Sequence, residues 1–266
     1  MSGSVRPAAV AGLFYPDDPE ELRTVVDDLL QAAPAEGTPP KAIIAPHAGY
    51  VFSGEVAARA YARLTPGRAR VRRVVLLGPA HRVPVRGIAA PSVDYFETPL
   101  GKVPVDQAAI AALAGRGQVT YHDETHRMEH SLEVHLPFLQ RVFDNVSLVP
   151  LVVGDSSPEQ VAAVLEGLWG GEETLVVIST DLSHFHEYDD ARHRDARTSR
   201  HIEALDYEHI HYDDACGRNP VNGLLYLARD RGLGVSMLEM CNSGDTAGPR
   251  DRVVGYGAYV LTGEPA

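Results

Sequence analysis

Cysteines and long apolar segments are scarce in this sequence. Only two cysteines, Cys216 and Cys241, occur among 266 residues, so disulfide bonds are not what holds the chain together. No apolar run approaches the roughly 18 residues that a membrane-spanning helix needs. The N-terminal segment 1–12 also lacks the basic start and the long apolar region of a signal peptide. We therefore expect a cytoplasmic protein with no membrane attachment.

Basic clusters and common nucleotide or hydrolase motifs are also lacking. The chain has 36 acidic and 24 basic residues, a formal net charge of −12, so a polyanion would meet a repulsive field. The most basic stretch, residues 68–73, is short and typical of a solvated loop before a strand. Neither G-x-x-x-x-G-K-[ST] nor G-x-S-x-G occurs. The sequence therefore predicts no nucleic-acid binding and does not support nucleotide binding or α/β-hydrolase chemistry.

What the sequence does contain is a regular alternation of strand-like and helix-like segments. Apolar runs predict strands over residues 42–45, 74–77, 87–90, 148–153, 175–179, 234–240 and 253–261. Apolar residues at helical spacing predict helices over 20–32, 55–64, 106–114, 158–169, 191–205 and 221–231, with Ser157 capping the fourth. We therefore expect a single α/β domain over residues 1–266, a three-layer αβα sandwich with a mixed, largely parallel central sheet. Its last strand should be an edge or antiparallel strand.

Histidines follow three of the predicted strands. The chain has 12 histidines; His47 comes directly after the first strand and His81 after the second. A later strand ends at Asp181 and reaches His184. Ligands of open α/β sheets gather beyond the carboxyl ends of the strands, so three histidines there favour a site over separate structural roles. Because neutral imidazole is a good ligand for zinc, iron or copper, the sequence predicts a metal site.

A third metal ligand is needed beside the two histidines His47 and His81. The candidates that the residues leave open are Asp181, Glu129, Glu133, Cys216 and Cys241. Cys216 lies just before a helix that Pro220 is expected to begin, where the helix dipole stabilises a thiolate. Cys241 ends an apolar run and fits a core position equally well. We therefore favour Cys216.

The segment MEHSLEVHLPFL, residues 128–139, contains His130, Glu133 and His135 in an H-x-x-E-x-H pattern. This pattern is neither H-E-x-x-H nor H-x-x-E-H, and its two histidines would lie about 140° apart around a helix. A zinc-protease site is therefore not expected. The plain interpretation is an amphipathic helix with its leucines inward. The alternative is that Glu129 or His130 lines the metal pocket and supports its ligands.

Five motifs, in order along the chain, resemble those of the Memo family, also described as AmmeMemoRadiSam system protein B. They are IIAPHAGYVFSG, LLGPAHRVP, EHSLEVHLPFL, STDLSHF and CGRNP. With AGLFYP near the N-terminus, the resemblance extends from about Gly12 to the final strand. It implies a fold similar to that of the class III (LigB-like) extradiol dioxygenases, enzymes that use non-haem Fe(II) to open catechol rings.

The resemblance also implies roles for residues that match these motifs. His47 and His81 match the two histidine ligands. Cys216, in CGRNP, matches the metal-site cysteine of the family, where the dioxygenases have a glutamate. His184, in STDLSHF, matches the acid–base histidine of those enzymes, and Asp181 matches another residue of the catalytic pocket.

Five further residues are expected to contact a substrate: Phe14, Tyr50, Phe52, Glu129 and His130. Eukaryotic family members have tryptophan where Phe14 stands and tyrosine where Phe52 stands, in a pocket that binds phosphotyrosine peptides. The missing indole and hydroxyl argue against such peptides here. Bacterial and archaeal members are often encoded beside radical-SAM and AMMECR-type proteins, so the resemblance suggests these as partners, in addition to a small-molecule or peptide ligand.

Three functions are open on the sequence alone. The first, which we favour, is a non-haem metal-dependent oxidoreductase of dioxygenase type, with the metal on His47, His81 and Cys216 and with His184 moving protons. The second is a binding module, with a structural metal or none, for a small anionic ligand, a peptide or a partner protein. The third is a metal store or chaperone. A His-His-Cys set is softer than one with a carboxylate; we expect Fe(II), with copper or zinc as alternatives.

Overall fold

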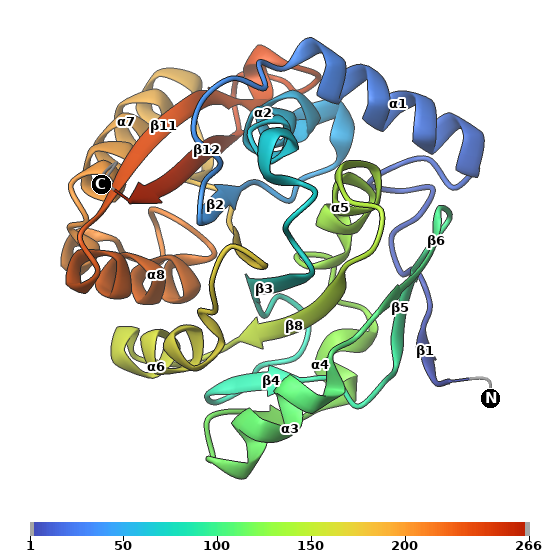
Figure 1. Cartoon of the computed structure of the whole chain (residues 1–266). Helices are drawn as coiled ribbons and strands as arrows, with labels where there is room; N and C mark the ends of the chain where they lie inside the picture. The colour runs from blue at the N-terminus through green and yellow to red at the C-terminus, as the bar shows by residue number, and fades with distance from the viewer. Residues whose placement is uncertain (1–2, 264–266) are drawn as a thin grey trace.

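The computed structural model describes residues 3–263, and these are built around one large mixed sheet (Figure 1). The strands follow the spatial order β10-β12-β2-β9-β3-β8-β4-β7, and β11 also pairs with β12. Their bounds are β2 Ala42–Ala45, β3 Arg73–Pro79, β4 Ile88–Ala90, β7 Thr120–Tyr121, β8 Ser147–Val153, β9 Thr174–Ser179, β10 His184–His186, β11 Leu233–Asn242 and β12 Val253–Gly263. The predicted α/β architecture with a mostly parallel sheet is confirmed.

Four neighbouring strands, β2, β9, β3 and β8, run parallel and form the centre of the sheet. All residues of β2 and β9 are buried, and so are all but the first residue of β3 and of β8. Uninterrupted apolar runs are what such strands need, because helices cover both of their faces. Antiparallel strands flank this centre, with β12 between β2 and β11 and with β4 beside β8. The final strand is therefore antiparallel, and it lies inside the sheet and not at its edge.

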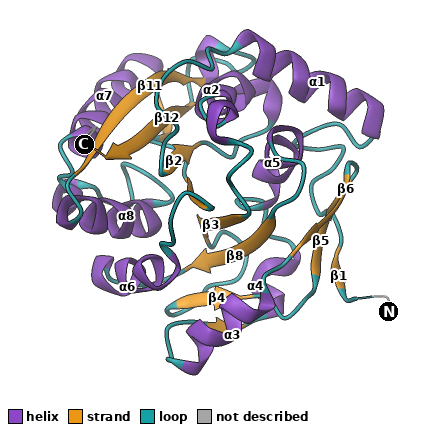
Figure 2. Ribbon diagram, viewed as in Figure 1, coloured by secondary structure: helices purple, strands orange, loops and turns teal. Residues whose placement is uncertain are grey.

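Helices flank the sheet on both sides, as Figures 1 and 2 show. The helices α1, α2 and α5 pack together on one side, and α6 packs against α8 on the other, where α7 covers β11 and β12. Ser157 caps α6 with a full capping box, as predicted. The helix bounds are α1 Pro19–Ala32, α2 Tyr50–Ala62, α3 Gln107–Gly115, α4 Asp123–Arg127, α5 Leu136–Val142, α6 Pro158–Leu168, α7 Tyr188–Glu203 and α8 Arg218–Asp230. Within residues 3–263, no helix combines the length and the apolar character needed to cross a membrane.

A smaller sheet of three strands was not predicted from the sequence. It consists of β1 (Val5–Arg6), β5 (Tyr95–Thr98) and β6 (Gly101–Pro104). Strand β1 has two residues, and β6 is exposed at all positions but one. Such short strands carry no apolar run, so the sequence pattern could not distinguish them from loops.

Three helix starts and one whole segment differ from the prediction, and among the helices α7 begins at Tyr188, before the predicted start at residue 191. Helix α2 begins at Tyr50, before the predicted start at residue 55, and α8 begins at Arg218, before Pro220. The segment that was expected to form one amphipathic helix is instead a 3₁₀ turn over Glu133–His135, followed by α5. Pro137 explains the break, because it has no N–H to donate to a carbonyl of the preceding turn. The leucines of this segment are buried, as predicted.

Candidate metal centre

The carboxyl ends of β2, β9 and β3 meet at one edge of the sheet, because these strands are parallel neighbours. His47 lies just beyond the end of β2, and His81 lies just beyond the end of β3. Cys216 comes from the segment that precedes α8. One ligand atom from each of these three residues lies within 4.8 Å of the other two. The structure thus assembles the His-His-Cys group that the sequence predicted.

The hydrogen bonds of His47 fix the tautomer of its buried imidazole. Its Nδ1 lies 2.6 Å from the Ser179 hydroxyl oxygen, and that hydroxyl donates its single proton to the Ser131 carbonyl at 2.6 Å. Since the hydroxyl can then only accept from the ring, Nδ1 carries the proton. The lone pair is therefore left on Nε2, which lies 3.5 Å from the Cys216 sulfur.

The orientation of His81 is set by the buried carboxylate of Glu129. Oε1 of Glu129 lies 2.9 Å from Nδ1 of His81, and Oε2 accepts the His81 backbone N–H at 2.6 Å. Burial alone would raise the pKa of Glu129, but hydrogen bonds from His81 and Ser131 lower it to about 2. The carboxylate is thus ionised and accepts Nδ1–H, which leaves Nε2 of His81 free to bind a metal ion.

Cys216 reaches the two histidines because the backbone beside it passes very close to β9. A Cβ on Gly217 would overlap the Ser179 carbonyl oxygen and lie 2.7 Å from Cβ of Thr180, so only glycine fits there. The Cys216 sulfur accepts the Asp181 backbone N–H at 3.4 Å. It also lines a cavity of about 220 Å³ together with Tyr212 and Asn219.

The thiol of Cys216 differs from the prediction in its acidity. We expected the dipole of the following helix to stabilise its thiolate, but burial and the nearby Asp181 raise the pKa of Cys216 to about 12. Without a cation the sulfur therefore keeps its proton at neutral pH. Because a metal ion displaces the proton of a coordinating thiol, the fit of this residue to a metal site follows from its position beside the two imidazoles.

Comparison with known proteins identifies the family. A family model described as "Memo-like protein" matches residues 6–260. A "MEMO1 family protein" of Metallosphaera sedula is 34% identical over 275 residues, covering 94% of this chain and 97% of the relative. Another, of Ignicoccus hospitalis, is 36% identical over 282 residues, covering 96% and 97%. The chain belongs to the Memo family.

A solved structure shares the fold of this Memo-family chain. It is an uncharacterised protein of Escherichia coli K12 with a TM-score of 0.55 and 14% identity, and the match covers 82% of this chain and 98% of that one. At this level of identity the similarity concerns the fold alone.

The two residues expected to act in catalysis lie next to this group. Asp181 is buried and accepts the His47 backbone N–H at 2.8 Å. Burial raises its pKa to about 7, against the opposing effect of that hydrogen bond. His184 lies in β10, where its Nδ1–H donates to the Leu182 carbonyl at 2.8 Å and leaves Nε2 without a proton. Burial lowers the pKa of His184.

The residues expected to contact a substrate are spread over two environments. The His130 ring stacks on His81 with centroids 4.6 Å apart, and the Phe14 ring lies 4.8 Å from His130. Phe52 lies beside Gly49 at the start of α2, near Phe14. Tyr50 is buried, and its hydroxyl donates to the Val134 carbonyl at 2.8 Å. The structure thus brings Phe14 and His130 to the metal group, and substrate contact by any of the five residues stays a prediction.

Two of the alternative third ligands lie outside the His-His-Cys group. The buried Glu133 carboxylate forms an ion pair with Arg6 and accepts the Val10 N–H and the Tyr15 hydroxyl. It is a structural residue that ties the N-terminal segment to the rest of the chain. Cys241 lies in β11 and is not part of the His-His-Cys group.

Two residues that set the tautomer of His47, Ser179 and Ser131, were not predicted from the sequence. Both stand inside quoted motifs, STDLSHF and EHSLEVHLPFL. A small hydroxyl residue at the end of a buried strand, just before the loop with Asp181, was the only signal. It could not show which imidazole the hydroxyl meets.

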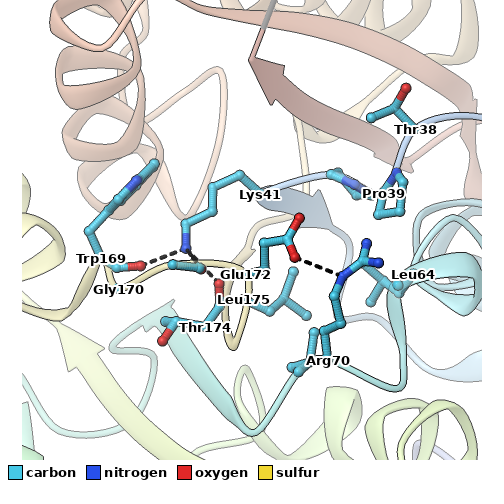
Figure 3. A pocket seen from close by; sticks show the side chains of 14 residues that line it. Thr38, Pro39, Lys41, Leu64, Arg70, Trp169, Gly170, Glu172, Thr174 and Leu175 are labelled. Carbon is cyan, nitrogen blue, oxygen red and sulfur yellow. Dashed lines mark hydrogen bonds and ion pairs between the residues drawn. The ribbon is translucent and has the colours of Figure 1, made fainter. Parts of the chain in front are cut away.

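A larger cavity, of about 410 Å³, lies at the opposite edge of the sheet, where β2 and β9 begin (Figure 3). Lys41 donates from Nζ to the carbonyls of Trp169, Gly171 and Thr174 at 2.5–2.7 Å. Burial lowers the pKa of Lys41 to about 8, but three carbonyl acceptors match the three N–H bonds of an ammonium. Lys41 therefore ties the start of β2 to the connection between α6 and β9, and it has no free proton to offer a ligand.

Proposed function

We propose that this Memo-family chain is a non-haem metal-dependent oxidoreductase of dioxygenase type, with a LigB-like three-layer fold and with a metal ion held by His47, His81 and Cys216. The observation that supports this proposal is the fixed tautomer of both imidazoles. Ser179 and Glu129 each hold an Nδ1–H, so two Nε2 lone pairs are available beside one sulfur. A histidine with only a structural role in the core would not need its Nε2 lone pair next to a second imidazole and a thiol.

The donor set fits a borderline or soft metal ion. Two imidazoles and one thiolate suit Fe(II), Cu(I) or Zn(II), and we propose Fe(II), with copper or zinc as alternatives. With only three protein ligands, His47, His81 and Cys216, a redox-active ion held there would keep coordination positions open for substrate and oxygen.

The neighbouring residues are proposed to bind the substrate and move its protons. Nε2 of His184 accepts a proton from a substrate hydroxyl, since its Nδ1–H is held by the Leu182 carbonyl. Asp181 orients the backbone of His47 and supplies a second titrating group. Phe14 and Phe52 are proposed to give the pocket an apolar side suited to an aromatic ring.

Metal analysis of protein purified without oxygen tests the ligand assignment. The parent chain is expected to hold close to one equivalent of metal, and His47→Ala and Cys216→Ser are expected to lose it. Cys241→Ser is the matched control and should keep the metal, because this cysteine lies outside the group. Unchanged metal content in both ligand variants would contradict the site.

Oxygen uptake with a panel of catechols and other aromatic diols tests the reaction. The iron-loaded parent is expected to consume oxygen, and His184→Ala is expected to keep its metal but lose most of the uptake. Absence of uptake with both iron and copper would contradict the oxidoreductase.

Metal binding without turnover is the second candidate function, and the thiolate ligand favours it. A store or binding module needs only a soft donor set that exchanges metal reversibly, which the same three residues provide. Reversible exchange without oxygen uptake would support this function. On the family resemblance alone, we propose radical-SAM and AMMECR-type proteins as partners. The cytoplasm is the location that we propose from the sequence.

A further inference from the structure

A second group of metal-ligating side chains lies where α7 ends, and it shares no residue with the His-His-Cys group. It consists of His201, Asp206 and His209, whose ligand atoms all lie within 4.8 Å of one another. Oδ2 of Asp206 lies 2.8 Å from Nδ1 of His201, and Oδ1 lies 2.8 Å from Nδ1 of His209. One carboxylate therefore stands between two imidazole nitrogens.

The chain makes this group through a tight turn at the C-terminus of α7. The Asp206 N–H donates to the His201 carbonyl at 2.8 Å, and the Leu205 N–H donates to the Ile202 carbonyl at 3.1 Å. This is a Schellman motif, and Leu205 takes the left-handed conformation (φ 56°) that glycine usually provides. The turn brings Asp206 back against the last turn of the helix.

A short 3₁₀ turn, Tyr207–His209, then brings the second histidine to the same carboxylate. The side chain of Tyr207 is buried and anchors this turn. The two imidazole rings lie nearly parallel, 22° apart, with their centroids separated by 5.5 Å. Both Nδ1 atoms therefore face Asp206 from neighbouring positions.

Two imidazole nitrogens and one carboxylate oxygen form a ligand set typical of Zn²⁺ sites that keep open positions. The side chains of His201 and Asp206 are 27% and 34% exposed, and that of His209 is 66% exposed. Water can therefore complete the coordination of an ion, and the ion can exchange with solvent.

We propose that His201, Asp206 and His209 form a second, exchangeable site for a divalent transition-metal ion such as Zn²⁺. When the ion binds, the two Nδ1 lone pairs become ligands and each imidazole carries its proton on Nε2. A histidine that is doubly protonated beforehand releases one proton to the solvent. The ion fastens the end of α7 to the segment that leads from His209 to Cys216. This site is independent of the proposed oxidoreductase function.

Zinc titration by calorimetry tests the proposal, with Zn²⁺ alone as the probe. In a chain that carries His47→Ala and Cys216→Ser, one equivalent of zinc is expected to bind. Adding Asp206→Asn or His209→Ala should weaken this binding at least tenfold. His193→Ala is the matched control, because His193 lies on the same helix and donates from Nδ1 only to the Asp189 carbonyl.

Thermal unfolding gives a second readout. Zinc is expected to raise the melting temperature of the double variant, and this shift should vanish with His209→Ala, whose exposed side chain is not needed for folding. If the double variant does not fold, the parent chain is titrated instead. The parent is expected to bind two equivalents of zinc, and its Asp206→Asn variant is expected to bind one. Equal zinc binding in Asp206→Asn, His209→Ala and the control would overturn the proposal and leave a hydrogen-bonded cluster.

Discussion

Replacing Glu129 by glutamine should weaken metal binding at His81 although the side chain keeps its size. The carboxylate accepts three N–H groups: Nδ1–H of His81 at 2.9 Å, the His81 backbone N–H at 2.6 Å and the Ser131 backbone N–H at 2.9 Å. An amide offers one oxygen and one NH₂ group, so in either orientation an NH₂ group faces at least one donor. If NH₂ faces Nδ1, His81 must move its proton to Nε2, the atom that would bind the metal.

The size of the effect follows from these contacts. Loss of an outer hydrogen-bond partner typically costs 10- to 100-fold in metal affinity, or about 1.4–2.7 kcal/mol. The buried donor left without an acceptor should also lower the free energy of unfolding by about 1–3 kcal/mol. Both effects are expected in Glu129→Gln, since the carboxylate is buried and ionised at neutral pH.

Competition with a chelator of known affinity measures the metal binding, and urea unfolding of the metal-free protein measures the stability. Glu124→Gln is the matched control, because it removes the same charge from an exposed residue that pairs only with the neighbouring Arg127. The reasoning is refuted if Glu129→Gln binds metal within twofold of the parent while His81→Ala does not bind it.

Three further predictions concern stability. The buried His126 and His135 have pKa values lowered by burial to about 4 and about 3; the unfolded chain takes up their protons first as pH falls below about 6.5. As the pH falls from 6 to 4, each of the two histidines should therefore lower the free energy of unfolding by about 1.4 kcal/mol per pH unit. In urea titrations at several pH values, His135→Gln should show a weaker dependence of this free energy on pH than the parent. Gly217→Ala should lower the free energy of unfolding by about 1–3 kcal/mol, because the added methyl group overlaps β9, and it should also weaken metal binding. Gly115→Ala, where the added methyl group meets open space in a helix, should raise the free energy of unfolding by about 0.5–1 kcal/mol. Arg6→Met should lower the free energy of unfolding by about 3–5 kcal/mol in urea, because it leaves the buried Glu133 carboxylate without its cation; a loss below 1 kcal/mol would contradict this.

Much of the candidate centre could be predicted because it depends on chain order and strand direction. His47 and His81 each follow a buried apolar run, and parallel strands place such positions at one edge of a sheet. The possible support by Glu129 was visible only as an alternative. Its contact with His81 joins residues 48 positions apart, and no local pattern determines such a pairing.

The pKa of Cys216 could not be predicted from the sequence. Its place before a helix suggested a stabilised thiolate, yet burial dominates and raises its pKa. The sulfur is buried because Gly217 lets the backbone next to Cys216 pack closely against the end of β9, where the Asp181 N–H donates to the sulfur. Strand β10 could not be predicted from a local pattern either. Phe185 takes a left-handed conformation (φ 63°) there, and the pairing with β12 shifts register between His184 and His186.

By itself the sequence determined the α/β architecture, the strands that end at the metal group and the family motifs, because apolar periodicity and strand ends are local properties. The tertiary structure alone decided that Ser179 and Glu129 fix the two imidazoles, that Glu133 is structural and that His201 meets His209 across Asp206. These contacts are decided by how hydrogen-bond donors and acceptors are satisfied inside the packed fold, and that balance exists only once distant segments are in contact.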